Sequence, residues 1–434
     1  MSPAMRRRRT SSAHESVLVT GIGTILPGAD GVEDFWRHLR NGDSQLGFLS
    51  CCDPGDVPVR VAGEIREFDH RRHLPVLPET HAAKYSRDIL IVMSAVEQAR
   101  GNAGLHGEQV DPRRTMLIAS CSRGPMTWVD SAIRAEFDGQ GSAPHFSSKN
   151  AMLHGLAGAP ATLAAINSDV QGVVTTLSSA CVGGNHAIGL ATDALWAGRA
   201  DVAYVVGYEF PLAPVVLNAF GSMGAGVLSA EQENPTQAMK PYTRQRNGMV
   251  LSEGAVALCL ERETSARHRK ARAYAEVLGH EATNEAANPF SMDPSGKHTA
   301  DAIHRLLADC GTEPADVRYY CGHGTATKHN DLAESRALGV LYEGRPRSSW
   351  PPIGSIKPIY GHLLGGAGVV NAAATALMIH HGSLVPTINC TDPDPECDHD
   401  HVAEGARPVD LTLAVSLAFA IGSQTSALAM GAAA

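Results

Sequence analysis

Residues Thr176–Gly189 read TLSSACVGGNHAIG, and they place one cysteine, Cys181, between small residues and a pair of glycines. The residues just before it, Gln171–Leu177, are rich in β-branched side chains, which is typical of a short buried strand. The residues just after it, Asn185–Trp196, carry apolar side chains at helical spacing. We therefore expect Cys181 at a junction between strand and helix, where the glycines permit a sharp turn and a close backbone approach.

Two interpretations of Cys181 follow from this position. A free cysteine is usually a small buried hydrophobic side chain. At the start of a helix, however, unpaired N–H groups and the helix dipole favour an anion, so we expect a lowered thiol pKa and a better nucleophile. The stretch alone leaves both interpretations open.

Strand-like and helix-like segments alternate along the rest of the chain, which predicts an α/β fold with a mainly parallel sheet. The predicted strands are Val17–Gly21, Thr115–Ser120, Val202–Gly207, Arg272–Leu278, Val317–Cys321 and Leu413–Phe419, and the predicted helices are Val32–Leu39, Ser86–Gly101, Thr299–Cys310 and Gly365–His380. The charged stretch Arg262–Lys270 separates two such sets, so we predict halves at residues 15–265 and 266–434. Residues 1–14, which include the basic run Arg6–Arg9, are predicted to be disordered.

Composition narrows the classes of function. The chain has 434 residues, 44% of them hydrophobic, and a net charge of −9, which argues against nucleic acid or an anionic membrane as the main partner. Its nine cysteines show no zinc-binding spacing, which favours reduced thiols and a cytoplasmic location. We expect neither a signal peptide nor a transmembrane span.

Three further segments carry reactive side chains beside predicted turns. Cys321–Thr327 reads CGHGTAT, so His323 follows a predicted strand, at the end of an α/β sheet where ligands bind. Gly354–Gly368 reads GSIKPIYGHLLGGAG, with Lys357 and His362 at a turn before a Gly/Ala-rich helix. Leu417–Ser426 reads LAFAIGSQTS, a strand with a sharp turn whose N–H groups are suited to an oxyanion hole. Each segment alone fits an ordinary loop or helix start equally well.

Together and in this order, the four segments resemble the β-ketoacyl-acyl carrier protein synthases, the ketosynthases of the thiolase superfamily. The resemblance runs from Val17 to Ala427 and includes KPYTRQRNG at 240–248, SEGA at 252–255 and PTIN at 386–389. It implies a thiolase-like α/β fold, in which two pseudo-repeated halves give five layers in the order αβαβα.

The resemblance also implies roles for individual residues. Cys181 would accept the acyl group, and His323 and His362 would be the catalytic histidine pair. Supporting and binding positions fall on Lys357, Asp331 and Glu334 (charged support), the backbone N–H groups of Cys181 and Ala420 (oxyanion hole), and Thr325, Thr327, Phe419 and Ala420 (substrate and pantetheine arm). No cofactor and no metal site is implied, and Cys397–His401 is interpreted as a surface loop rather than a metal site.

The implied reaction is a decarboxylative Claisen condensation. An acyl group on Cys181 would react with malonyl-acyl carrier protein to give a 3-ketoacyl-acyl carrier protein. The implied partners are an acyl carrier protein and a second chain, either an identical one or a homologue of the chain-length-factor kind. Two alternatives remain, namely a non-elongating partner subunit, which usually lacks the nucleophile, and an acyltransferase or ester-forming variant.

Several positions depart from the family pattern. Ala420 stands where a phenylalanine commonly gates the nucleophile, Val182 replaces a smaller residue, and Asn247 and Asn371 replace acidic ones. These departures favour a specialised type II polyketide or polyene-type ketosynthase over a housekeeping fatty-acid enzyme. An acidic carrier would need a local basic face, for which the candidates are Arg71, Arg72, Lys240, Arg244 and Arg246.

Overall fold

The computed structural model describes residues 14–105, 110–138, 149–290 and 292–433. The segment predicted to be disordered, 1–14, lies outside the described residues except for His14, whose ring stacks on Trp196. None of the described helices is long and apolar enough to cross a bilayer.

The described strands comprise one large sheet and two small hairpin-like pairs. Their bounds are β1 Val17–Leu26, β2 Ala29–Asp30, β3 Gly47–Phe48, β4 Val61–Ala62, β5 Thr115–Ser120, β6 Val174–Leu177, β7 Val202–Glu209, β8 Gly254–Arg262, β9 Ala275–Asn284, β10 Tyr319–Cys321, β11 Ile353–Gly354, β12 Ser383–Leu384, β13 Arg407–Pro408, β14 Leu413–Ala420 and β15 Gln424–Gly431.

The helices lie between these strands in chain order. Their bounds are α1 Val32–Asn41, α2 Glu79–Ala82, α3 Arg87–Asn102, α4 Met126–Asp138, α5 Lys149–His154, α6 Ala159–Asn167, α7 Gly183–Trp196, α8 Pro214–Gly221, α9 Glu263–His268, α10 Lys297–Asp309, α11 Lys328–Leu341, α12 Lys357–Tyr360 and α13 Ala367–His381. Two short 3₁₀ turns matter below, η5 Ala180–Val182 before α7 and η9 Leu364–Gly366 before α13.

The two halves of the chain share one strand topology. The strands of the first half lie in the spatial order β6-β5-β7-β8-β1, and those of the second in the order β11-β10-β14-β15-β9. In each half this is third-second-fourth-fifth-first, with the same pattern of parallel and antiparallel pairs. The pseudo-repeat that the resemblance implied is therefore present in the topology, although the two halves show no repeat in sequence.

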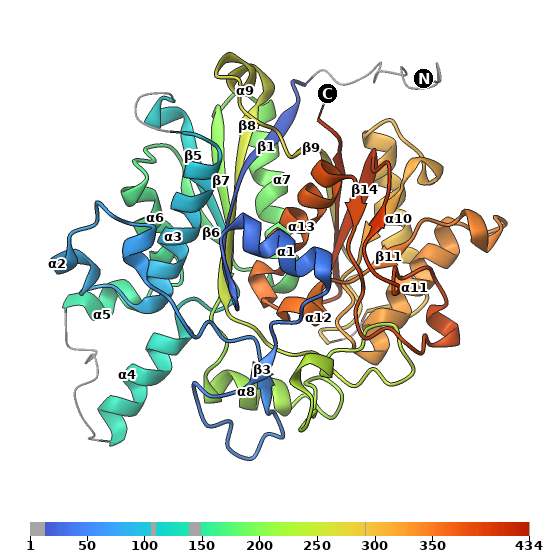
Figure 1. Cartoon of the computed structure of the whole chain (residues 1–434), viewed down its shortest axis with the longest axis horizontal. Helices are drawn as coiled ribbons and strands as arrows, with labels where there is room; N and C mark the ends of the chain where they lie inside the picture. Colours follow the sequence, from blue (N-terminus) through green and yellow to red (C-terminus); the bar gives the residue numbers. More distant parts are fainter. Residues whose placement is uncertain (1–13, 106–109, 139–148, 291, 434) are drawn as a thin grey trace.

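The elements form five layers, visible from left to right in Figure 1. Helices α3 and α6 cover the outer face of the first sheet, and α10 and α11 cover the outer face of the second. Between the sheets lie α7 and α13, which pack on each other and on strands of both halves. Three apolar cores fill the spaces between layers, and the central one draws residues from both halves.

The sheet is mixed, so the expectation of a mainly parallel sheet was wrong. Strands joined by crossover helices pair in parallel, as β5 does with β6 and β7. Strands β14 and β15 are joined only by residues 421–423, too few for a crossover, so they pair antiparallel. The two halves are joined through a short antiparallel pairing of β1 and β9.

Glycines allow the middle helices to touch. A Cβ atom on Gly184 of α7 would lie 2.8 Å from Cα of Gly368 on α13 and 2.6 Å from the backbone nitrogen of Val369. A Cβ atom on Gly368 would lie 2.6 Å from the backbone nitrogen of Asn185. Backbone atoms cannot move aside as a flexible side chain can, so these helix starts require glycine.

We predict that Gly184→Ala lowers the free energy of unfolding by about 1–3 kcal/mol, because the added methyl group forces the two middle helices apart. Urea unfolding measures the change. Gly339→Ala on α11 is the matched control, since a Cβ there meets no atom within 4 Å and alanine favours a helix by up to about 1 kcal/mol. Equal stabilities for both variants would contradict the contact.

Candidate active site

Cys181 lies in a strained turn between β6 and α7. Ala180, which precedes it, has a φ of 47°, a left-handed conformation that costs energy for any residue but glycine. Behind the turn, a Cβ on Gly183 would lie 2.4 Å from the hydroxyl of Ser120, so this glycine lets the turn sit against β5. The thiol is free and half-buried, and it lines a cavity.

His323 lies in the loop after β10, and two buried charged side chains hold the backbone of that loop. The carboxylate of Glu334 on α11 accepts the N–H of His323 at 2.6 Å and the N–H of Gly324 at 3.0 Å. It also accepts the hydroxyl of Tyr242 at 2.8 Å. The ammonium group of Lys357 donates to the carbonyl of His323. These bonds fix the point from which the imidazole projects.

His362 is fixed by its own backbone. Its N–H donates to the carbonyl of Val250 at 2.8 Å, and its carbonyl accepts the N–H of Ser252 at 3.1 Å. The residue before it, Gly361, has a φ of 80°, which glycine adopts readily, and this turn follows α12. The segment that carries Lys357 is thereby turned so that His362 faces the cavity.

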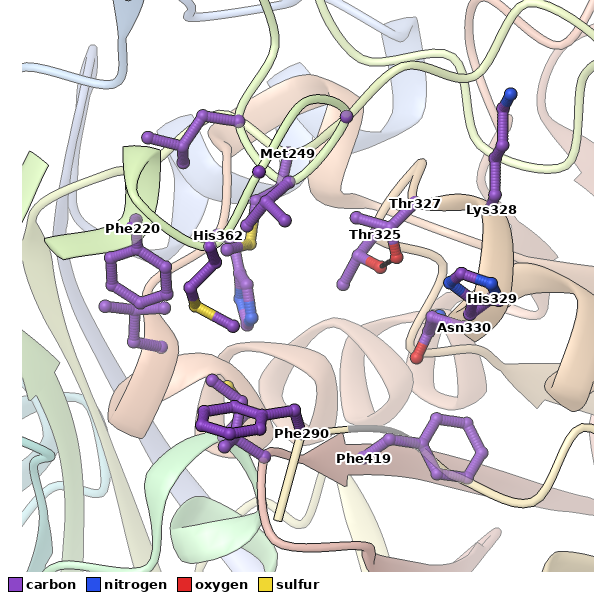
Figure 2. A pocket seen from close by; sticks show the side chains of 18 of the residues that line it. Phe220, Met249, Phe290, Thr325, Thr327, Lys328, His329, Asn330, His362 and Phe419 are labelled. Carbon is purple, nitrogen blue, oxygen red and sulfur yellow. Dashed lines mark hydrogen bonds between the residues drawn. The ribbon is translucent and has the colours of Figure 1, made fainter. Parts of the chain in front are cut away.

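The three side chains converge. The sulfur of Cys181 and one ring nitrogen each of His323 and His362 all lie within 4.8 Å of one another. The two rings meet edge to face, with centroids 5.1 Å apart, and Phe419 packs its edge against His323. All three groups line one cavity of roughly 1260 Å³. Figure 2 shows His362 and Phe419 among the side chains that line it. Residues that are far apart in the sequence thus share one space large enough for a thioester substrate.

Comparison with known proteins agrees with this geometry. Residues 14–266 match the β-ketoacyl synthase N-terminal domain, and residues 274–391 match the C-terminal domain. The chain belongs to the β-ketoacyl synthase family.

Two curated relatives place this ketosynthase more closely. The tetracenomycin polyketide synthase ketoacyl synthase alpha subunit of Streptomyces glaucescens is 32% identical over 96% of this chain and 98% of its own. The 3-oxoacyl-[acyl-carrier-protein] synthase 2 of Synechocystis sp. is 30% identical over 95% of this chain and 97% of its own. The chain is a β-ketoacyl-acyl carrier protein synthase, which catalyses ketosynthase condensation in type II polyketide or fatty-acid biosynthesis.

Solved structures agree on the fold. The ketosynthase complex AntDE:AntF, described as a type II acyl-carrier protein in complex with its ketosynthase bound to the hexaketide, matches with a TM-score of 0.85 at 27% identity. The ishigamide ketosynthase/chain length factor matches with the same TM-score and identity. Each match covers 97% of this ketosynthase and 100% of the solved chain. The thiolase-like fold that the sequence predicted is confirmed.

Burial shifts the pKa values of Cys181, His323 and His362. It raises the pKa of the Cys181 thiol to about 12, because loss of water outweighs the attraction of Lys357 and Arg123 for a thiolate. It lowers the pKa of His323 and His362 well below the ordinary value, and Lys357 nearby adds to this. The expectation of a lowered thiol pKa at the helix start was therefore wrong. Burial therefore favours the protonated thiol and the neutral form of both imidazoles.

The supporting acids of the second half are also buried. Asp331 accepts the N–H of Tyr242 at 2.8 Å, and burial raises its pKa to about 6. Burial raises the pKa of Glu334 to about 7. Tyr242, which bonds to both acids, was missed as a functional residue, although it lies in a segment that resembled the family. Nothing in that segment showed that its hydroxyl reaches a carboxylate ninety-two positions away.

Glu209, at the end of β7, is the second residue that sequence reasoning missed. It is fully buried, and it accepts the N–H groups of Ser122 at 2.9 Å, Arg123 at 3.1 Å and Gly365 at 2.9 Å. Its carboxylate therefore ties the loop after β5 to the turn before α13, on either side of Cys181. A signal was available, since this acid lies two positions after the predicted apolar strand Val202–Gly207.

The remaining predicted binding residues also line the cavity. Thr325 and Thr327 exchange a hydrogen bond of 2.9 Å between their hydroxyls, and Phe419 and Ala420 form the wall beside Cys181. Asn371 donates its amide to the carbonyl of Gly322 at 3.2 Å, so it braces the strand end before His323.

Two predictions need correction. Arg246, a candidate for carrier docking, is buried and paired with Asp394 at 2.6 Å, so it braces the interior. The segment Cys397–His401 is not a surface loop throughout, because Cys397 and His401 are buried. The ring of His401 stacks on Tyr242, and its two nitrogens lie against backbone carbonyls.

We predict that iodoacetamide alkylates Cys181 at a rate that rises about tenfold per pH unit between about pH 6.5 and 9.5 without a plateau, because a thiol whose pKa is about 12 titrates beyond this range. Peptide mass spectrometry separates Cys181 from the other thiols. In urea the same peptide should give an ordinary thiol profile, levelling near about pH 8.5–9. A plateau below neutral pH in the folded enzyme would instead indicate a resting thiolate–imidazolium pair.

Proposed function

We propose that Cys181 is the acyl-accepting nucleophile of this ketosynthase. A neutral imidazole of His323 or His362 takes the thiol proton, and the thiolate attacks the carbonyl carbon of an acyl thioester. The new bond joins sulfur to the acyl carbon, the bond to the carrier sulfur breaks, and the proton leaves with the carrier thiol. What supports this assignment above all is the separation of the three groups, within 4.8 Å in one cavity.

We propose that the two histidines also stabilise the enolate formed in the second step. The malonyl group on its carrier loses carbon dioxide, and negative charge develops on the thioester oxygen. In both rings Nδ1 is buried without a hydrogen-bond partner in the described part of the chain, which leaves Nε2 to face the cavity. Two neutral N–H donors can meet that oxygen. The enolate carbon then attacks the acyl carbonyl, and Cys181 leaves as a thiolate and recovers a proton.

The proposed supporting roles follow from the bonds already described. Lys357 and Glu334 hold the backbone that carries His323. Asp331 holds the backbone of Tyr242, whose hydroxyl donates to Glu334. Lys357, Glu334 and Asp331 are therefore proposed as positioning residues. The backbone N–H groups of Cys181 and Ala420 are proposed as the oxyanion hole for the acyl carbonyl, because both residues line the cavity at the same wall.

The cavity has two unlike ends, which suggest two arms. Figure 2 shows Thr325, Thr327, Lys328, His329 and Asn330 at one end. Phe220, Met249 and His362 lie at the other. We propose that the polar end takes the pantetheine arm of the carrier, with Phe419 and Ala420 beside it, and that the apolar end takes the acyl chain.

A specialised type II polyketide pathway suits these features better than fatty-acid synthesis. Ketoacyl synthases of polyketide pathways recur among the relatives. Ala420 leaves the wall beside Cys181 without an aromatic ring, so the entrance admits a bulkier acyl group. The alternative of a partner subunit without activity is disfavoured by the presence of Cys181 beside both histidines. An acyltransferase is disfavoured because simple transfer has no use for two enolate donors.

We predict that the enzyme, incubated with an acyl-carrier thioester, gains one acyl group on Cys181, and that addition of malonyl-carrier releases a 3-ketoacyl product. Mass spectrometry follows both steps. Cys181→Ala should abolish labelling, whereas Cys51→Ala, which removes an exposed thiol outside the cavity, should not. His323→Ala should lower the rate of condensation by more than about a hundredfold. Labelling without condensation would indicate the transferase, and absence of labelling would indicate the partner subunit.

A chelator is added to each assay, because a sulfur and two imidazoles this close could also bind zinc.

We propose an acyl carrier protein and a second ketosynthase-like chain as partners. The second chain is proposed to pair along β6, the edge strand of the first half. Val173 and Ile166 beside this edge are 59% and 69% exposed, so an unpaired strand edge and exposed apolar side chains lie together there. We also propose that residues 15–265 and 266–434 supply the nucleophile and the histidines respectively, and that the enzyme works in the cytoplasm, where its free cysteines would stay reduced.

We predict that Val173→Glu weakens self-association or pairing with a chain-length-factor-like chain by at least about tenfold, because a carboxylate would be buried at the pairing edge. Analytical ultracentrifugation measures the change. Val76→Glu is the matched control, since Val76 is 82% exposed and lies in the loop before α2, outside the strands of the sheet. An unchanged association constant for Val173→Glu would move the interface elsewhere.

A further inference from the structure

Arg123 stands in the wall of the cavity without a role in the reaction described above. It lies in the loop after β5, its backbone N–H is held by Glu209, and its side chain is exposed to the cavity. The guanidinium carbon lies 5.0 Å from the centre of the Phe220 ring, so the cation rests on an aromatic face. Its position is therefore fixed at the apolar end of the cavity.

The guanidinium has no ion-pair partner in the described part of the chain. Glu209 accepts the backbone N–H of Arg123 rather than its side chain. The other cavity-lining arginines are paired, Arg244 with Asp392 at 3.5 Å and Arg246 with Asp394 at 2.6 Å. The planar guanidinium of Arg123, with its five N–H donors, thus lines the cavity without an anionic partner among the described residues.

The surroundings of Arg123 are otherwise apolar. Val57, Val59, Leu228 and Met249 form one packed cluster with Phe220, and Cys181 packs against the same cluster. All of these residues line the cavity. An acyl chain bound through Cys181 and running along this wall meets apolar side chains and, on the Phe220 ring, the guanidinium.

We propose that Arg123 selects an acyl group that carries a carboxylate at its far end. The inference rests on the proposed function, because the acyl group must first be joined to Cys181. A plain alkyl chain in this arm would strip water from the guanidinium and offer nothing in return. A terminal carboxylate replaces that water with a bidentate, charge-assisted pair. The arm thus both favours the ω-carboxyacyl group and disfavours its alkyl counterpart.

A second anion must be distinguished, the phosphate of the pantetheine arm. The polar end of the cavity, with Lys328 and His329, is suited to that phosphate, and Arg123 lies on Phe220 at the other end. N-acetylcysteamine thioesters carry no phosphate, so they isolate the contribution of the acyl group.

The experiment measures acylation of Cys181 by N-acetylcysteamine thioesters of succinyl, glutaryl, adipoyl and pimeloyl groups, each against its alkyl counterpart of equal length. In each exchange a Cys181 sulfur–carbon bond forms, the N-acetylcysteamine sulfur–carbon bond breaks, and the thiol proton passes to the departing thiol. At one or more lengths the wild type should react at least about tenfold faster with the carboxylated group. Arg123→Gln should abolish or reverse that preference, and Arg123→Lys should keep part of it.

Arg244→Gln is the matched control, because it removes an arginine of the same cavity that already has a carboxylate partner. It should leave the ratio of the two rates unchanged. The inference is overturned if Arg123→Gln leaves the ratio of the two rates unchanged. It is also overturned if Arg123→Gln affects only carrier-bound or coenzyme A thioesters, because Arg123 would then bind the phosphate. If no thioester acylates Cys181 at all, the proposed function fails rather than the assignment of Arg123. Equal urea unfolding of all variants shows that the fold is intact. Iodoacetamide reactivity of Cys181 should be unchanged in Arg244→Gln and somewhat lower in Arg123→Gln, which loses a cation that favours the thiolate.

Discussion

The contact between α7 and α13 is the constraint on which the site depends. Gly184 and Gly368 let the two helix starts meet backbone to backbone. Cys181 lies in the turn immediately before α7, and His362 lies shortly before α13. A methyl group between these helices would separate the sulfur of Cys181 from the imidazole of His362. The glycine contact between α7 and α13 therefore determines both the packing at the centre of the fold and the distance between Cys181 and His362.

Burial also decides how the chemistry is organised. The thiol lies near a buried ammonium group, which favours a thiolate, and near Glu209, which opposes one. Loss of water is the largest contribution for the cysteine and for both histidines, and it favours the uncharged form of each. A site of this kind holds no fixed charge on its reacting atoms and forms charge only as bonds change. Preoriented N–H donors are then most effective, since little water competes with them.

Local pattern predicted much of the fold, and for physical reasons. Strand Thr115–Ser120 has the predicted bounds, and the helix after Cys181 begins within two residues of its predicted start, because apolar periodicity reports local burial. The strand directions in the sheet were predicted wrongly, because they depend on the length of each connection. The position of Glu209 at the end of an apolar strand gave a signal, but its bonds to two distant loops did not follow from spacing. The bonds of Tyr242 and the burial of Arg246 likewise depend on contacts between distant segments. The expected lowering of the Cys181 pKa was wrong for the same reason. A helix start can be recognised from local sequence, whereas desolvation of the thiol depends on the surrounding fold.

The pseudo-repeat explains why one cavity carries both His323 and Arg123, an arginine without an ion-pair partner in the described part of the chain. In each half the loop after the second strand is held by a buried glutamate that accepts two consecutive N–H groups, those of Ser122 and Arg123 in the first half and those of His323 and Gly324 in the second. Likewise, the turn before each middle helix begins with a left-handed residue, at Ala180 and at Leu364. Only the first of these turns holds a thiol, and only the second loop holds an imidazole. The duplicated scaffold thus offers equivalent positions around one cavity, and each half has filled them with different chemistry.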